Sequence, residues 1–180
     1  ICSFKTARDM NKELNNKIEL QKKVVATLEA SSDEMVVSML IDLKEHGELF
    51  YLNSLLEMLT GNRSEMLKKA VLEFISDIKL QDAVPLISTY VEKNFPSKDV
   101  VDVVTSSWQS RLDFSQHLDP YFNVLINGNY KIAFEAFTVI ENSIDNLSAE
   151  QLTSRMDIVK KGATKVDRDK QLLLIEMVSV

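Results

Sequence analysis

The fold is decided by residues 64–97, SEMLKKAVLEFISDIKLQDAVPLISTYVEKNFPS. In the first half of this stretch, apolar residues recur at steps of three and four, the spacing of one helical face: Leu67, Val71, Phe74, Ile75 and Ile78. The second half continues with the same spacing at Ile87, Tyr90 and Val91. Pro85 does not suit a helix interior but suits a first turn, where its missing N–H is no loss. The stretch therefore predicts two amphipathic helices joined by a tight corner.

The preceding residues, 31–63, have the same organisation. The cluster Ser31-Ser32-Asp33-Glu34 predicts a helix N-terminus, because it supplies a side-chain cap and first-turn acids. Gly47 is placed where a left-handed glycine would end this helix. A second apolar stripe runs from Glu48 to Thr60 and stops at Gly61-Asn62.

Residues 98–129 and 130–165 repeat the plan. The first has a corner at Phe114-Ser115, and Pro120 stands in its second helix near the place that Pro85 occupies. The second has its corner at Asp145–Leu147, after which Ser148 opens a further helix. A final apolar run begins at Asp167.

The corners predicted near Gly47, Leu80, Phe114 and Asn146 are spaced by about 32 to 34 residues. A two-helix unit that recurs at a fixed period of this size is typical of an α-solenoid, in which each unit stacks on the next because it cannot bury its apolar faces alone. The sequence therefore predicts an all-α fold.

The run Asp82-Ala83-Val84-Pro85-Leu86-Ile87 resembles the opening of the second helix in HEAT repeats, where the Asp caps the helix. The match is fainter at His117-Leu118-Asp119-Pro120, and residues 31–63 and 130–165 lack the proline. The resemblance implies an α-α superhelix, right-handed and of about four to five helical hairpins, over residues 31–180 as a single domain. The choice between a HEAT-type and an armadillo-type subclass stays open.

Residues 1–30 predict a polar N-terminal helix over 5–29. A heptad seam runs along it through Phe4, Ala7, Asn11, Leu14, Ile18, Gln21, Val25 and Leu28. One interpretation is a terminal capping helix, polar outside because nothing covers it. The alternative is a coiled-coil stalk, because most seam positions are apolar.

Composition excludes several classes of protein. Four glycines and three prolines in 180 residues argue against a turn-rich sandwich or barrel. One cysteine and two histidines leave no internal disulfide and no Cys- or His-based metal site, so no metal and no cofactor is expected. No apolar run is long enough to span a bilayer. A cytoplasmic location is favoured, while export or membrane tethering through a segment upstream of Ile1 stays open.

The net charge of −6 is unevenly distributed. Residues 1–30 carry six basic and four acidic side chains, whereas residues 31–97 carry six basic and eleven acidic ones. Because affinity for nucleic acids rests mainly on Lys and Arg contacts with phosphates, the acidic body argues against nucleic acid as a partner. It is compatible with a protein partner, including a basic one.

No catalytic motif accompanies the histidines. His46 beside Gly47 suits a helix C-terminus, and His117 suits a polar corner. The sequence contains no phosphate-binding glycine loop, no His-Glu-x-x-His and no Gly-x-Ser-x-Gly. We therefore expect a non-enzymatic protein.

The same family resemblance allows one enzymatic alternative. Some HEAT-like proteins are DNA glycosylases that excise alkylated bases with Trp, Tyr, Arg and Asp in a basic groove, roles that Trp108, Tyr121, Arg111 and Asp113 would take here. The acidic body argues against this alternative, and Trp108 falls on an apolar stripe, where a core role is expected.

The function expected from the resemblance is non-catalytic protein binding or scaffolding along a groove lined by the second helices. The candidate contact residues are those predicted to lie off the apolar stripes: Tyr51, Glu57, Thr89, Glu92, Tyr121 and Asn123. Tyr51 and Tyr121 are the first candidates for anchors, since tyrosines suit interfaces, with packing at the edge of a repeat joint as the alternative.

Overall fold

The computed structural model describes residues 7–164, 166 and 168–179, and these residues form an all-helical fold without strands. The helices are α1 (Ala7–Ala30), α2 (Asp33–His46), α3 (Leu52–Thr60), α4 (Glu65–Asp77), α5 (Val84–Asn94), α6 (Val100–Ser110), α7 (Asp119–Asn127), α8 (Tyr130–Glu141), α9 (Ala149–Ala163) and α10 (Arg168–Ser179). Three short 3-10 helices lie at corners: η1 (Gln81–Ala83), η2 (Ser115–His117) and η3 (Ile144–Asn146). The predicted all-α class is confirmed.

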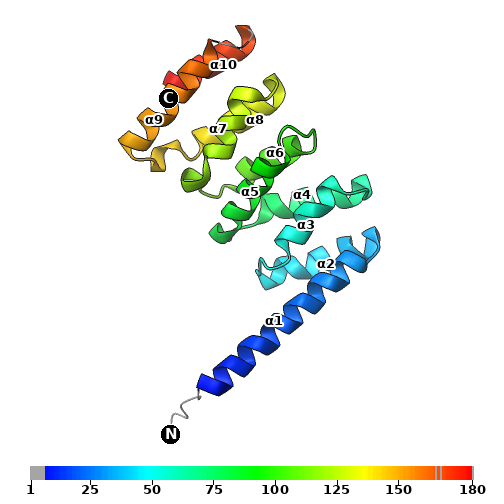
Figure 1. The fold of residues 1–180 in the computed structure, drawn as a ribbon. Coiled ribbons are helices and arrows are strands. Elements are labelled where there is room, and N and C mark those ends of the chain that lie inside the picture. Colours follow the sequence, from blue (N-terminus) through cyan, green and yellow to red (C-terminus); the bar gives the residue numbers. More distant parts are fainter. Residues whose placement is uncertain (1–6, 165, 167, 180) are drawn as a thin grey trace.

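The helices pack in two rows (Figure 1). Each helix contacts the one two places further along the chain, so α1, α3, α5, α7 and α9 form one row. The helices α2, α4, α6, α8 and α10 form the other row in the same way. Neighbours in sequence, such as α3 with α4 and α7 with α8, join the rows, and the apolar side chains between the rows form the core.

Local signals in the sequence set the helix ends. The side chain of Ser64 accepts a hydrogen bond from the Leu67 N–H at the start of α4, and Ser32, Asn129 and Ser148 cap other helices in the same manner. Pro85 and Pro120 occupy the first turns of α5 and α7. Gly47 ends α2 with a φ of 61°, the left-handed conformation predicted for it.

The predicted period reappears as bonds between consecutive units. The Lys44 ammonium pairs with Asp77, 33 residues later, and the Ser76 hydroxyl donates to Gln109, also 33 residues later. The Gln81 side chain bonds to the backbone of Asp113, 32 residues later. At these points, residues 32 or 33 positions apart therefore lie side by side.

Arg63 fastens the first two units together. Its guanidinium donates to Ser31 O at 3.0 Å and to Asp33 Oδ1 at 3.0 Å, and the Ser64 N–H donates to Asp33 Oδ2 at 2.7 Å. The Ser64 N–H, assisted by Arg63, holds the pKa of Asp33 below its usual value. This carboxylate therefore joins the start of α2 to the start of α4.

The helix α1 is much longer than the helix that supports it. At a rise of about 1.5 Å per residue, α1 with 24 residues is about 36 Å long and α3 with nine residues about 14 Å long. The C-terminal part of α1 enters the core through Leu28, and its N-terminal part extends beyond the stack (Figure 1). No helix in the described part of the chain combines the length and hydrophobicity that a membrane span requires.

Candidate functional site

The structure corrects the prediction that Tyr51 and Tyr121 are surface anchors, because both side chains are buried. Tyr51 precedes α3, so the helical face on which the sequence placed it does not exist there. Its hydroxyl donates to Leu43 O at 3.0 Å, and its ring packs edge-on against Phe74. Both tyrosines therefore pack in the core.

Tyr121 lies in the first turn of α7, a helix that contacts α5, α8 and α9. Its hydroxyl donates to Ser107 Oγ of α6 at 3.0 Å, and its ring packs edge-on against Phe114. Burial raises the pKa of Tyr121 well above the ordinary value. A helix enclosed on several sides buries residues that a single amphipathic stripe assigns to the surface.

The other four predicted contact residues, Glu57, Thr89, Glu92 and Asn123, are exposed. Glu57 and Thr89 lie in one groove of about 390 Å³ between α3 and α5, which has Leu56 and Leu86 among its apolar lining residues. Glu92 and Asn123 are not among the described residues that line this groove. The structure therefore brings together two of the six predicted residues.

Tyr90 also lines the α3–α5 groove, and its hydroxyl is buried without a hydrogen-bond partner among the described residues. Burial, with a smaller contribution from the negative charge of Asp99, raises the pKa of Tyr90 to about 12. Its hydroxyl therefore stays neutral at physiological pH.

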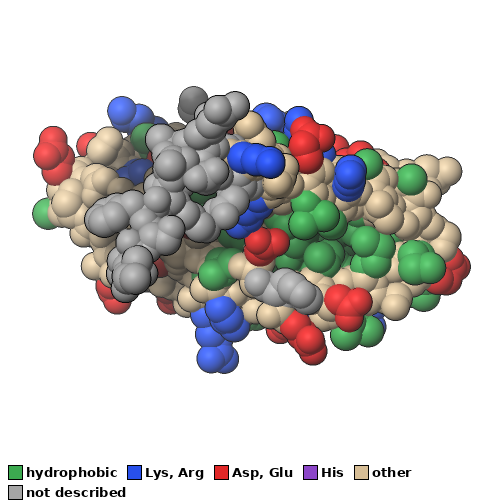
Figure 2. All heavy atoms as spheres, turned by 90° about the horizontal axis from the view of Figure 1, so that it is seen from below, with side chains coloured by type: hydrophobic (Ala, Val, Ile, Leu, Met, Phe, Trp, Pro, Cys, Tyr) green, Lys and Arg blue, Asp and Glu red, His purple; other side chains and the backbone are tan. Residues whose placement is uncertain are grey.

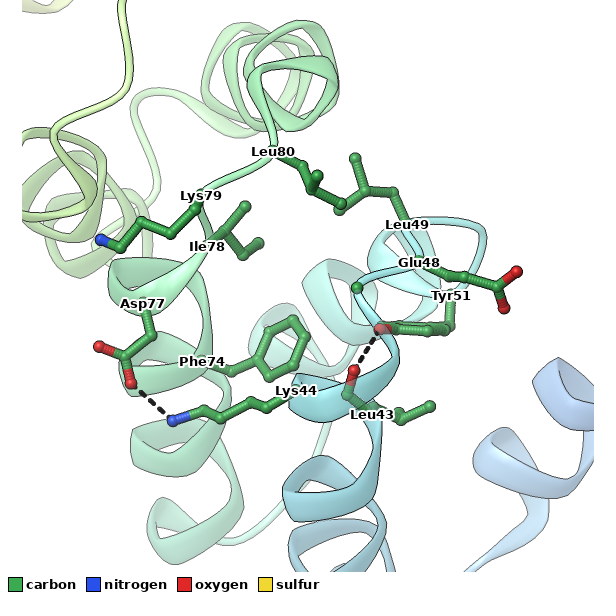
Figure 3. A pocket seen from close by; sticks show the side chains of 11 residues that line it. Leu43, Lys44, Glu48, Leu49, Tyr51, Phe74, Asp77, Ile78, Lys79 and Leu80 are labelled. Atoms are coloured by element: carbon green, nitrogen blue, oxygen red, sulfur yellow. Dashed lines mark hydrogen bonds and ion pairs between the residues drawn. The ribbon is translucent and has the colours of Figure 1, made fainter.

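A more apolar cavity, which the sequence did not predict, lies between the first and second corners (Figure 3). The end of α2 and residues 47–51 form one side of this cavity, and the end of α4 and residues 78–80 form the other. Its volume is about 260 Å³. We name it the corner pocket and define it by its lining residues: Leu43, Lys44, Gly47, Glu48, Leu49, Tyr51, Phe74, Asp77, Ile78, Lys79 and Leu80.

Local backbone geometry creates the corner pocket. Gly47 turns the chain sharply at the end of α2, while Ile78 leaves α4 with φ −59° and ψ 134°. The two connecting segments therefore run away from the helix ends instead of continuing them. In Figure 3, Leu49 and Leu80 point toward one another across the space between these segments, and the rings of Tyr51 and Phe74 line it.

Charged side chains stand around this apolar lining. The Lys44 ammonium meets the Asp77 carboxylate at 2.6 Å, joining the two sides of the pocket (Figure 3). Glu48 is also partly exposed. Burial, followed by the charge of Glu48, raises the pKa of Tyr51, so its hydroxyl remains a neutral donor. This arrangement can bury an apolar group and offers charges of both signs at the edge.

The structure brings together two of the four residues of the glycosylase alternative. Trp108 and Arg111 line one depression at the corner between α6 and α8, and the Trp108 Nε1–H donates to Glu135 Oε2 at 2.7 Å. Tyr121 is buried, so it is not available to contact a base. Asp113 accepts the Ser115 N–H at 2.9 Å and stabilises its own corner.

The described residues contain no group of three or more His, Cys, Asp and Glu side chains placed to hold a metal ion. His46 lies at the end of α2, and its side chain is outside the described part of the structure. His117 ends the 3-10 helix η2, at the polar corner predicted for it.

Comparisons with models of protein families, with curated proteins and with solved structures find no match to this chain.

Proposed function

We propose that the two rows of helices form an α-solenoid of the HEAT or armadillo kind, with α1 as its N-terminal capping helix. Support comes from the contacts between alternate helices and from the bonds that recur at intervals of 31 to 33 residues along the α2–α4–α6 row. The Pro-initiated helices α5 and α7 agree with the resemblance to HEAT repeats.

The function that this geometry supports best is non-catalytic protein binding, with the corner pocket as the anchor site. The observation that carries this proposal is an apolar cavity of about 260 Å³ with charged groups at its edge. This volume lies below the range of about 300 to 1,000 Å³ typical of small-molecule pockets, so the pocket suits one apolar side chain of a partner better than a cofactor.

The energetics agree with such an anchor. Burying one Leu, Ile, Phe or Met side chain contributes about 1.5 to 3 kcal/mol, and anchors of this kind dominate many interfaces. The edge groups Lys44 and Asp77 already pair with each other, so they add orientation and selectivity more than affinity. Binding would therefore be transient unless other surfaces contribute.

The groove between α3 and α5 is the second contact surface that we propose for the same partner. It presents Glu57 and Thr89 over Leu56 and Leu86. Glu92 and Asn123, which are exposed on α5 and α7, extend this proposed surface.

Selection of peptides from a displayed random library against the intact chain tests the proposal. Leu80 lines the corner pocket and is 41% exposed, so Leu80→Lys places a charge there without disturbing the core. Met66→Lys on α4 is the matched control, because Met66 is 50% exposed and does not line the pocket in the described structure.

We expect selected peptides to share an apolar anchor residue and to bind Leu80→Lys at least about tenfold more weakly than wild type, a loss of about 1.4 kcal/mol. Met66→Lys should bind like wild type. Peptides that bind Leu80→Lys as tightly as wild type, or a selection that yields no apolar anchor, would contradict the assignment.

A further inference from the structure

The helix α1 presents a seam, apolar from Leu14 to Leu28 except at Gln21, that runs from the core to solvent. Leu28 is fully buried and Val25 half-buried, whereas Ile18 is 39% exposed and Leu14 57% exposed. These residues occupy one face, because they are separated by steps of seven, three or four. The face that packs inside the molecule at its C-terminal end therefore continues outward uncovered.

The neighbouring helix is too short to cover this seam. The nine residues of α3 extend about 14 Å, less than half of the length of α1. Beside the exposed part lies a trough of about 370 Å³, whose apolar lining comes from Ile18, Val25, Ala26 and Phe50. Figure 2, which looks at the molecule from below, shows hydrophobic side chains gathered at the surface of this end.

The residue types at the seam are typical of a two-helix pairing. In the heptad, Ile18 and Val25 take the a positions, and Leu14 and Leu28 take the d positions. Branched residues at a with leucine at d favour two strands, because each fits the hole that a partner helix presents there. The expected occupant of the seam is therefore one additional helix.

The flanking charges indicate which kind of helix would fit. Lys17 takes a g position and Lys22 an e position. In a parallel pair of two copies of α1, Lys17 of one helix would face Lys22 of the other, and an antiparallel pair would bring the two Lys17 side chains together. A second copy is therefore disfavoured by like-charge repulsion, whereas carboxylates at the facing positions would be attracted.

On both flanks of the seam, the lysines already pair with carboxylates. Lys17 lies 3.5 Å from Glu48, and Lys22 lies 3.1 Å from Glu19 of the same helix. Lys17, Lys22 and Glu19 are largely exposed and Glu48 is partly exposed, so these pairs are weak and can be exchanged for carboxylates of an incoming helix.

We propose that the exposed seam of α1, with the trough beside Phe50, docks an amphipathic helix of a partner protein whose apolar stripe is flanked by Glu or Asp. This surface adjoins the corner pocket through the Lys17–Glu48 pair, but the trough and the corner pocket share no lining residue in the described structure. The inference therefore does not depend on the pocket assignment.

Two synthetic four-heptad peptides test the proposal against the intact chain. Both carry Ile at a and Leu at d, but one has Glu at every e and g position and the other has Lys there. Binding is followed by fluorescence anisotropy at low ionic strength. We expect the Glu peptide to bind at least about tenfold more tightly than the Lys peptide, because only the former complements Lys17 and Lys22.

A matched pair of variants locates the binding. Ile18→Glu alters the seam, and Leu20→Glu adds the same charge to an off-seam position that is 63% exposed. We expect Ile18→Glu to weaken binding of the Glu peptide at least about tenfold relative to Leu20→Glu. Helical circular dichroism should show both variants folded like wild type, since both side chains are exposed.

Absence of binding, equal affinity for the two peptides, or equal affinity of the two variants would overturn the proposal. Sedimentation equilibrium supplies one further outcome. A wild-type dimer that Ile18→Glu dissociates and Leu20→Glu preserves would assign the seam to a second copy, which also overturns it.

Discussion

The first corner packs against the second, and the second against the third, but these two joints are closed differently. At the joint of the second and third corners, the Gln81 side-chain amide donates to Asp113 O and accepts the Asp113 N–H at 3.1 Å, so that it holds both backbone polar groups of one residue. Lys79 adds a bond to Ser110 O at 3.3 Å. At the joint of the first and second corners, Glu48 is the equivalent of Gln81. Each directly follows the residue at which its corner is predicted, Gly47 or Leu80.

This difference has a chemical reason. A side-chain amide carries both a donor and an acceptor, whereas a carboxylate only accepts, so Glu48 cannot hold the N–H and the C=O of one residue as Gln81 does. The joint of the first and second corners is instead lined by leucines and aromatic rings and contains the corner pocket. A cavity is therefore found where the joint between two corners lacks the polar closure of the next joint.

The largest expected effect concerns the aromatic lining of the corner pocket. Phe74→Ala removes a buried ring that packs edge-on against Tyr51, and we expect a loss of about 3 to 5 kcal/mol in the free energy of unfolding. Chemical denaturation measures this loss. Phe134→Ala on α8 is the control, because that ring is half exposed and should cost much less. Equal losses in the free energy of unfolding for the two variants would show that the Phe74 ring is not part of the packed core.

The next effect distinguishes two buried hydroxyls. The Tyr51 hydroxyl at the first corner is bonded to Leu43 O, whereas that of Tyr90, on the helix after the second corner, has no partner among the described residues. The pKa of Tyr90 is raised to about 12, so the unfolded chain loses this proton near pH 10 and the folded chain only near pH 12. Stability conferred by the neutral hydroxyl is present below pH 10 and is lost as the pH rises toward 12.

We therefore expect the stability of wild type to fall relative to Tyr90→Phe between about pH 10 and 12, by up to about 2 kcal/mol. Urea denaturation of both proteins at several pH values measures the difference. Stability curves that stay parallel over this interval would contradict the shifted pKa.

The smallest effect comes from exchanging the corner residues themselves. Gln81→Glu replaces the donor facing Asp113 O with an acceptor, and we expect the free energy of unfolding to fall by about 1 kcal/mol. Glu48→Gln is the reverse exchange, a carboxylate replaced by an amide, at the open joint. It should change the free energy of unfolding by no more than about 0.5 kcal/mol. Thermal unfolding of the two variants tests the comparison. A larger cost for Glu48→Gln would mean that the first corner is also closed by a polar bond.

The helices and corners could be predicted because local residues determine them. Ser64, Gly47, Pro85 and Pro120 act within one turn of their own position, so their roles are visible without knowledge of the partners of each helix. The spacing of the corners follows from these local signals. The resemblance to HEAT repeats stays a prediction.

The burial of Tyr51 and Tyr121 could not be predicted in this way. It depends on residues of other helices, such as Phe74 and Ser107. These residues contact the two tyrosines on a side that a single amphipathic stripe assigns to solvent. The corner pocket depends in the same manner on two segments about 30 residues apart. A signal was present in Ile78 and Leu80, two apolar residues at a corner where polar ones are usual.

The contrast between the open joint of the first and second corners and the closed joint of the second and third is tested most directly by methyl NMR during a titration with benzene, an apolar probe that binds in apolar cavities. The account predicts saturable shifts for the methyl groups of Leu43, Leu49, Ile78 and Leu80, which line the corner pocket, and none for Leu112 beside the third corner. Shifts that are absent at the corner pocket, or equal at Leu112, would contradict it.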